Sequence, residues 1–207
     1  MIGIVDYGRG NIGAIFNLLK SFNIDVAVVD DTKQLKKMNK IILAGVGSFD
    51  DSINCLNNSG LREVLDDQVL NNNIPVLGIC IGMQIMACSS EEGKASGLCW
   101  IDNSKIIKIN EKYLHSKPKL PHMGWNTVRS LRHSFIFDDI DKDKGFYFLH
   151  SYHFSCEEQY HLGTTNYGID FPSAVQKKNI FGVQFHPEKS HSNGIQVLKN
   201  FSNFSLC

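Results

Sequence analysis

One cysteine, Cys80, lies between two glycines where an apolar stretch is expected to pass from a strand into a helix. The segment Val76–Gln84 has the sequence VLGICIGMQ, with Gly78 and Gly82 each two positions from Cys80. A sharp strand-to-helix turn crowds its neighbours and leaves the nucleophile free above the sheet. Free N–H groups and partial positive charge at the helix start lower a thiol pKa from about 8.5 toward neutrality. The spacing therefore predicts a nucleophile elbow that presents Cys80 as a thiolate.

A proton carrier for this thiolate is offered by His186, which ends a strongly apolar stretch and is followed by Pro187 and Glu188. In extended backbone, side chains at i and i+2 share a face, so Glu188 can reach the ring nitrogen that does not face Cys80. Pro187 holds this spacing because it fixes φ. The carboxylate orients the imidazole and stabilises its charged form, and the ring later protonates the leaving group. We predict a Cys80–His186–Glu188 triad for acyl transfer.

Acyl transfer also requires N–H donors that face the developing oxyanion. One candidate is the backbone N–H of Ile81, directly after the nucleophile, and the others belong to the turn Gly45, Val46 and Gly47. In an open α/β sheet the carboxyl ends of the strands line the ligand crevice. We therefore expect both sources of N–H groups to converge beside Cys80.

The elements that must position these residues follow from the hydrophobic pattern. In the first half, short apolar runs alternate with helix-period segments, which is typical of parallel β-α-β units. Strands are expected at Ile2–Val5, Val26–Val29, Ile41–Ala44 and Ile74–Ile79. Helices are expected from Ile12, after the Asp31–Thr32 cap, and in a stretch that ends near Asn71–Asn73.

The second half has a different pattern, with aromatic and β-branched stretches from about Cys99 to Gln184 that favour mixed or antiparallel sheet. Its clearest strands are Phe146–Leu149 and Ile180–Phe185, and a helix with Ile195, Leu198 and Phe201 ends the chain. We predict an α/β, three-layer fold. It has a mostly parallel central sheet and an additional mixed or antiparallel portion, in one domain over residues 1–207.

Composition narrows the class of protein. The 207 residues are 43% hydrophobic and 20% charged, which excludes a disordered, collagen-like or coiled-coil chain. Lys and Arg number 21 and Asp and Glu also number 21, so the formal charge is zero. This balance argues against a nucleic-acid or anionic-membrane surface. No apolar run approaches the length of a membrane span and no signal peptide opens the chain, so a cytoplasmic protein is expected.

The cysteines show no repeated spacing and no C-x-x-C pair, which argues against a disulfide framework or a zinc site. Most are expected to be buried small hydrophobes; the six are Cys55, Cys80, Cys88, Cys99, Cys156 and Cys207. His150, His153 and Cys156 are spaced like metal ligands, but i and i+3 in a strand point to opposite faces. We expect no metal and no cofactor.

Several further motifs accompany the elbow, and together they span nearly the whole chain. They are DYGRGN at 6–11, GVG at 45–47, GICIGMQ at 78–84, SEEG at 90–93, PHMGWN at 121–126, HSY at 150–152 and QFHPEKS at 184–190. This set resembles the triad-type, class I glutamine amidotransferases, which have a flavodoxin-like fold. Within that family it is most similar to the glutaminase subunits of imidazole glycerol phosphate synthase.

The resemblance implies roles for these residues. Cys80 would form a glutamyl thioester, His186 would act as base and acid, and Glu188 would orient it. L-glutamine would be held by Gln84, Glu92, His150 and Ser151, with Glu92 facing the substrate ammonium. The ammonia would pass to a (β/α)8-barrel cyclase subunit, which makes imidazole glycerol phosphate and an aminoimidazole carboxamide ribonucleotide in histidine biosynthesis.

The same resemblance makes a heterodimer with the cyclase the expected assembly. Met123, Trp125 and Lys189 are candidates for the docking face, because aromatic and large apolar residues anchor interfaces. One position departs from the family: Ala44 replaces the usual proline before the Gly-Val-Gly turn. Alanine leaves the peptide orientation freer, so we expect a turn that is more mobile or more dependent on the partner.

Other functions stay open at this point. The segment Gly97–Asp102 resembles a variant group of these subunits in which ammonia serves a surface-sugar amidation. A stand-alone cysteine hydrolase, or a non-catalytic scaffold that keeps the fold, would also carry this pattern. Gly8, Gly10 and Gly13 with Asp30 formally match a dinucleotide-binding fingerprint.

Overall fold

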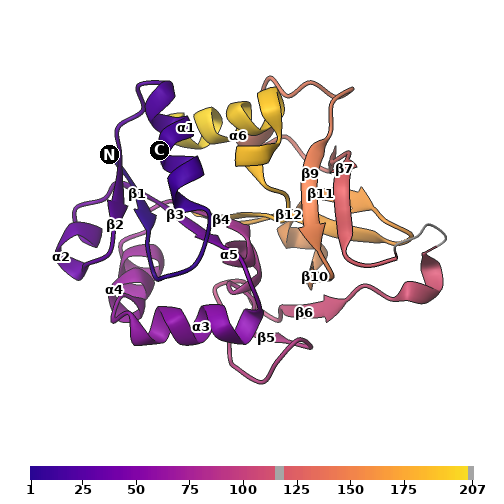
Figure 1. The fold of residues 1–207 in the computed structure, drawn as a ribbon, viewed down its shortest axis with the longest axis horizontal. Helices are drawn as coiled ribbons and strands as arrows, with labels where there is room; N and C mark the ends of the chain where they lie inside the picture. The colour runs from indigo at the N-terminus through magenta and orange to yellow at the C-terminus, as the bar shows by residue number, and fades with distance from the viewer. Residues whose placement is uncertain (115–118, 205–207) are drawn as a thin grey trace.

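The computed structural model describes residues 1–114 and 119–204, and a sheet of eight strands crosses its centre (Figure 1). Its strands are, in order across the sheet, β2 (Val26–Val29), β1 (Ile2–Val5), β3 (Lys40–Gly45), β4 (Val76–Cys80), β13 (Ile180–Val183), β12 (Asp170–Lys177), β11 (His161–Asn166) and β8 (Arg129–Ser130). The strands from β2 to β13 pair in parallel. From β13 onward the pairing is antiparallel.

Two small sheets complete the second half of the fold. One has the order β10 (Tyr152–Ser155), β6 (Lys105–Lys108), β5 (Ser89–Ser90). This sheet is mixed, since β6 pairs with β10 antiparallel and with β5 in parallel. The other pairs β7 (His122–Asn126) with β9 (Phe146–His150), antiparallel. The α/β class, the mostly parallel central sheet and the additional mixed or antiparallel portion are therefore confirmed.

Helices cover both faces of the main sheet, which makes three layers (Figure 1). One face carries α1 (Ile12–Ser21) and α6 (His191–Asn203), and the other carries α3 (Phe49–Asn58), α4 (Arg62–Asp66) and α5 (Ile81–Gln84). The shorter segments are α2 (Thr32–Leu35), η1 (Asp67–Asn71), η2 (Glu111–Tyr113), η3 (Phe135–Phe137), η4 (Glu158–Tyr160) and η5 (Pro187–Lys189). None of the helices in the described ranges combines the length and apolarity that crossing a bilayer requires.

Local sequence explains where these elements begin. The carboxylate of Asp31 accepts hydrogen bonds from two backbone N–H groups of α2, at 2.7 and 2.9 Å, as an N-cap residue does. Ser48 caps α3 in the same way through the N–H of Asp51 at 3.3 Å. Every residue of β4 is buried, as expected of a central parallel strand that is covered on both faces.

Several strand ends differ from the prediction by one or two residues, as in β4, which was expected at Ile74–Ile79 and spans Val76–Cys80, and two elements differ more. The expected strand Ile180–Phe185 ends at Val183, because the N–H of His186 donates to the carbonyl of Tyr147 at 2.9 Å and draws the chain toward β9. The helical stretch before Asn71 is divided into α3, α4 and η1, with Gly60 at φ 74° between the first two.

The cysteines also differ from the prediction. Cys88 and Cys99 form a disulfide, and the N–H of Cys99 donates to the carbonyl of Ala87, so hydrogen bonding aligns the two segments. Cys55 and Cys156 are half-buried and Cys80 is buried, while Cys207 lies outside the described residues. The expectation of mostly buried, unbridged cysteines was wrong because spacing along the chain does not report which segments fold together.

The elbow glycines provide a test of the packing between α5 and the sheet. A Cβ on Gly82 would collide with the carbonyl of Leu43 in β3, and a Cβ on Gly78 would lie 2.6 Å from Cε of Met86. We expect Gly82→Ala to lower the free energy of unfolding by about 1–3 kcal/mol or more, as overpacking does. Urea denaturation measures the change.

Gly13 in α1 is the matched control, because a Cβ there meets nothing within 4 Å. Gly13→Ala should be neutral or stabilising by about 0.5–1 kcal/mol through its helix propensity. An equal effect of the two substitutions would contradict this account of the elbow.

Candidate active site

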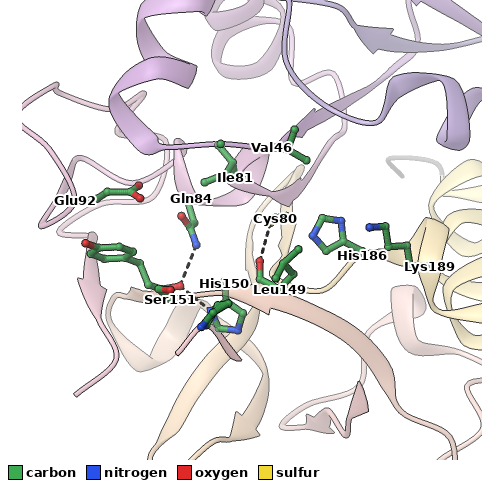
Figure 2. Close-up of a pocket in the computed structure, with 13 residues that line it drawn as sticks. Val46, Cys80, Ile81, Gln84, Glu92, Leu149, His150, Ser151, His186 and Lys189 are labelled. Carbon is green, nitrogen blue, oxygen red and sulfur yellow. Dashed lines mark hydrogen bonds between the residues drawn. The ribbon is translucent and has the colours of Figure 1, made fainter. Parts of the chain in front are cut away.

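Cys80 occupies the turn between β4 and α5 in a backbone conformation that side chains rarely adopt. Its φ is 54° and its ψ is −113°. The residue is 5% exposed, and its Sγ lies 3.9 Å from the carbonyl oxygen of Leu149, toward the cavity of Figure 2. The turn geometry is the one that the flanking glycines predicted.

The parallel pairing of β4 with β13 brings His186 to the same place. Gly182 pairs with Gly78 and Val183 with Ile79, so the two strands end side by side. Beyond β13 the chain turns into η5, and His186 stands next to Cys80 in Figure 2. Residues more than a hundred positions apart are thus brought together by strand register.

Glu188 binds His186 through the ring nitrogen Nδ1. His186 Nδ1 and Glu188 Oε1 are 3.0 Å apart, and the two side chains are 4% and 2% exposed. Burial alone would lower the pKa of His186, but hydrogen bonds and charges from Cys80 and Glu188 outweigh it and raise the pKa to about 10. At neutral pH the ring is therefore an imidazolium, which stabilises a thiolate at Cys80.

These side chains open into a cavity of about 320 Å³. It is lined by Val46, Gly47, Cys80, Ile81, Gln84, Glu92, Pro121, Leu149, His150, Ser151, Tyr152, His186 and Lys189. The volume is at the small end of the range for ligand sites and suits a single amino acid. Within the described residues no group of His, Cys, Asp and Glu side chains is placed to hold a metal ion.

The predicted sources of oxyanion donors meet at the cavity wall. Ile81 begins α5, where the first N–H groups have no partner within the helix. Val46 and Gly47 also line the cavity, with Val46 close to Ile81 in Figure 2, and Gly47 has φ 115°. Gly45 pairs with Cys80 in the sheet, and a Cβ there would collide with the hydroxyl of Tyr7, so this glycine makes room behind the turn.

Gln84 and Glu92 line the cavity, and each has one side-chain oxygen without a hydrogen-bond partner among residues 1–114 and 119–204. Gln84 Nε2 donates to the carbonyl of Tyr152 at 3.0 Å and to Gln184 Oε1 at 2.9 Å, which leaves Gln84 Oε1 as an acceptor. Glu92 Oε2 accepts the N–H of Phe49 at 2.7 Å. A carboxylate and an amide oxygen on one wall can accept the three N–H groups of an ammonium.

Comparison with known proteins agrees with this geometry. The family described as "Glutamine amidotransferase class-I" matches residues 3–203. The chain is 47% identical to imidazole glycerol phosphate synthase subunit HisH of Leptospira borgpetersenii, over 98% of this chain and 100% of that one. The chain belongs to the class I glutamine amidotransferases. The family resemblance found in the sequence is thereby confirmed.

Other relatives and solved structures agree. Imidazole glycerol phosphate synthase subunit HisH 2 of Pseudomonas aeruginosa is 41% identical over 97% of this chain and 98% of its own length. A crystal structure of a glutamine amidotransferase from Thermotoga maritima has a TM-score of 0.62 at 15% identity. Its alignment covers 96% of this chain and 82% of that protein. At this identity, the Thermotoga maritima structure supports only the assignment of the fold.

Both ring nitrogens of His150 in this amidotransferase already have partners. Nδ1 lies 2.8 Å from the carbonyl of Tyr152, and Nε2 lies 2.9 Å from Nδ1 of His122. Burial lowers the pKa of His150 to about 3 and that of His122 to about 4, so both rings are neutral. His150 lines the cavity but offers no free ring nitrogen, whereas Ser151 lies beside it on the same wall.

The three residues predicted for docking lie at the cavity rim or beyond it. Met123 and Trp125 are 59% and 51% exposed on β7, and neither lines the cavity. Lys189 does line it, with Nζ 5.5 Å from the ring centre of Tyr147. Sequence reasoning missed His122 and Gln184 as polar members of the amidotransferase site, although both stand inside quoted motifs. For Gln184, a polar residue in the otherwise apolar stretch Ile180–Phe185 was the available signal.

The triad supports a prediction about pH. Glu188 raises the pKa of His186, so Glu188→Gln should lower that pKa from about 10 toward its ordinary 6.5. The imidazolium is then lost at lower pH and stabilises the thiolate less. We expect the pH midpoint for alkylation of Cys80 by iodoacetamide to rise by about one unit. Mass spectrometry of the Cys80 peptide measures the rate.

The exposed carboxylate of Glu158, in η4, provides the control. Glu158→Gln should leave the midpoint where it is. A Glu188→Gln profile that overlays the parent profile would show that the carboxylate does not act through His186.

Proposed function

We propose that this protein is the glutaminase subunit of imidazole glycerol phosphate synthase, acting as one amidotransferase domain over residues 1–207. It hydrolyses L-glutamine to glutamate and supplies ammonia to a (β/α)8-barrel cyclase subunit in histidine biosynthesis. The observation that carries the proposal is the Cys80–His186–Glu188 arrangement in a cavity of single-amino-acid size. The relatives named above support the choice of synthase.

The proposed reaction begins when the Cys80 thiolate attacks the amide carbon of glutamine. The negative charge on the carbonyl oxygen is then stabilised by the N–H of Ile81 and by N–H groups of the turn that contains Val46 and Gly47. The tetrahedral intermediate collapses to a thioester as His186 donates its proton to the leaving ammonia. His186, now neutral, takes a proton from water, which attacks the thioester and releases glutamate.

Substrate selection in this proposal depends on the cavity residues Gln84 and Glu92. The free oxygens of Gln84 and Glu92 accept hydrogen bonds from the substrate ammonium, and the anchoring of Glu92 by Phe49 N–H keeps the carboxylate in place. Lys189, at the rim, provides a positive charge for the substrate carboxylate. His150 and Ser151 line the same cavity, with both ring nitrogens of His150 already bonded within the protein.

Docking is proposed at the β7–β9 sheet, next to the cavity. Met123 pairs with Leu149 and Trp125 with Tyr147. Met123, Trp125 and Leu149 are exposed, at 59%, 51% and 37%, so the sheet presents an apolar surface of the kind that anchors interfaces. Leu149 also lines the cavity, so ammonia released there would need to travel only a short way to a partner seated on this surface.

A cytoplasmic location is part of the same proposal. Cys99 is exposed, so in that compartment the Cys88–Cys99 bridge is open to reduction by glutathione.

The position before the oxyanion turn is a separate point. Ala44, which replaces the family proline, is buried at the end of β3, directly before this turn. We propose that its freer backbone makes the active orientation of the turn depend on the partner.

Glutamate release tests the function. We expect slow release by the isolated protein, faster release with the cyclase and its nucleotide ligand, and none from Cys80→Ala under either condition. Equal turnover of the unmodified protein with and without the cyclase would contradict coupling. Strong turnover of a γ-glutamyl peptide by the isolated chain would instead identify a stand-alone hydrolase, and copurification with a sugar-modifying ligase would move the ammonia to that pathway.

The docking surface has its own test. Trp125→Ala should weaken the complex with the cyclase by at least about 2 kcal/mol, roughly thirtyfold in Kd, because exposed tryptophans are frequent hot spots. Leu131→Ala is the matched control, since Leu131 is 45% exposed outside this sheet. Calorimetric titration gives both affinities, and similar losses in the two variants would argue against docking at β7–β9.

A further inference from the structure

Two buried amides, those of Gln84 and Gln184, connect the backbone carbonyl of Tyr152 to the sulfur of Cys80. Gln84 Nε2 donates to Gln184 Oε1 at 2.9 Å, and Gln184 Nε2 lies 3.8 Å from Cys80 Sγ, within hydrogen-bond range for sulfur. Gln84 is 2% exposed and Gln184 is fully buried. Water therefore does not compete for these contacts.

The orientation of both amides follows from their partners. The backbone carbonyl of Tyr152 can only accept, so the group of Gln84 that faces it at 3.0 Å is its NH2. The same NH2 reaches Gln184, so the Gln184 atom that faces it is the oxygen. The NH2 of Gln184 must then face Cys80. Flipping either amide would leave buried donors or acceptors facing their own kind.

A second chain fixes the Tyr152 carbonyl from the other direction. His150 Nδ1 donates to this carbonyl at 2.8 Å, and its Nε2 accepts from His122 Nδ1 at 2.9 Å. His122 Nε2 in turn accepts from Asn126 Nδ2 at 3.2 Å. Both rings are neutral, so each has one donor and one acceptor and the direction of every bond is determined.

The sulfur of Cys80 thus has an acceptor on one side and a donor on the other. A thiol can donate to the carbonyl of Leu149 at 3.9 Å, whereas a thiolate can only accept, and Gln184 provides the N–H group. A hydrogen bond to the charged form favours that form. The donor is held ready in a dry environment before any substrate binds, where such a bond is strongest.

We propose that Gln184 stabilises the Cys80 thiolate by a hydrogen bond, with its amide locked in the donating orientation by the His122–His150–Tyr152–Gln84 chain. The inference deepens the proposed function and rests on Cys80 being the nucleophile. Gln184 contacts the reacting atom, whereas His122 acts only through its neighbours. The same chain turns Gln84 Oε1 toward the cavity, so one network sets both the nucleophile and an acceptor for the substrate.

Other titratable groups also face Cys80 or its cavity, and the test must separate them from Gln184. His186 approaches from η5, Tyr7 lies behind the Gly45 turn, and Glu92 and Lys189 line the cavity. None of them contacts Gln184 through a hydrogen bond in the described residues, so a substitution at Gln184 leaves their own contacts in place.

The experiment is the rate of iodoacetamide alkylation of Cys80 against pH, on the full chain, by mass spectrometry of the Cys80 peptide. Gln184→Met keeps the size of the side chain and removes the donor. We expect its pH midpoint to rise by about one unit, so that the alkylation rate at pH values below both midpoints falls about tenfold. Gln68→Met, at another buried glutamine, is the control and should change neither.

His122→Phe is the second variant and covers the case in which Gln184→Met does not fold. The ring keeps its stacking on Tyr167 and Phe148, with centres 4.0 and 4.8 Å away, but loses its donor to His150. A smaller shift in the same direction is expected. An unchanged midpoint in the folded variants, or an equal shift in Gln68→Met, would overturn the inference.

The outcome is separable from that of the proposed function. Alkylation uses no glutamine and no partner, so Gln184 can be judged even if glutamate release is absent. Conversely, glutamate release that survives in Cys80→Ala would end the proposed mechanism whatever the alkylation profiles show. A drop in kcat for Gln184→Met with little change in KM would support an effect on the nucleophile rather than on substrate binding.

Discussion

The register between two neighbouring parallel strands determines this site. β4 ends at Cys80 and β13 ends three residues before His186, with Gly78 opposite Gly182. A slip of one residue would turn each side chain to the other face of the sheet and separate sulfur from imidazole. The two opposed glycines remove the side chains that would stand between the sheet and α5, since a Cβ on Gly182 would lie 2.6 Å from Met83 Cγ. The elbow, the cavity and the polar chain behind it all follow from this pairing.

Three buried histidines in this protein have different charges because their neighbouring groups differ. His186 keeps a carboxylate and a sulfur as neighbours, and these outweigh the burial that opposes its charge. His150 and His122 have only backbone, amide and each other, so burial dominates and they stay neutral. The charged ring of His186 is therefore suited to proton transfer. The neutral rings of His150 and His122 are suited to hold hydrogen bonds in a fixed direction.

Much of the fold and the core of the site could be predicted from local signals. Period-2 and period-3.6 apolar patterns located most strands and helices, and the glycines around Cys80 and the pair His186 and Glu188 carried the chemistry in a few adjacent residues. What could not be predicted depends on contacts between distant segments. The Cys88–Cys99 bridge, the His122–His150 pair and the contact of Gln184 with Cys80 depend on how sheets and loops meet in space, which periodicity does not encode.

The left-handed backbone at Cys80 has a consequence for how such a protein can change over generations. A residue with a Cβ at φ 54° costs on the order of 1–2 kcal/mol relative to glycine, which tolerates that region freely. Selection for folding stability alone would therefore favour glycine at position 80, where the reaction requires cysteine. Gains in thermal stability must come from other positions in the chain. A related protein that no longer catalyses the reaction would be recognised by glycine in place of the cysteine of the elbow.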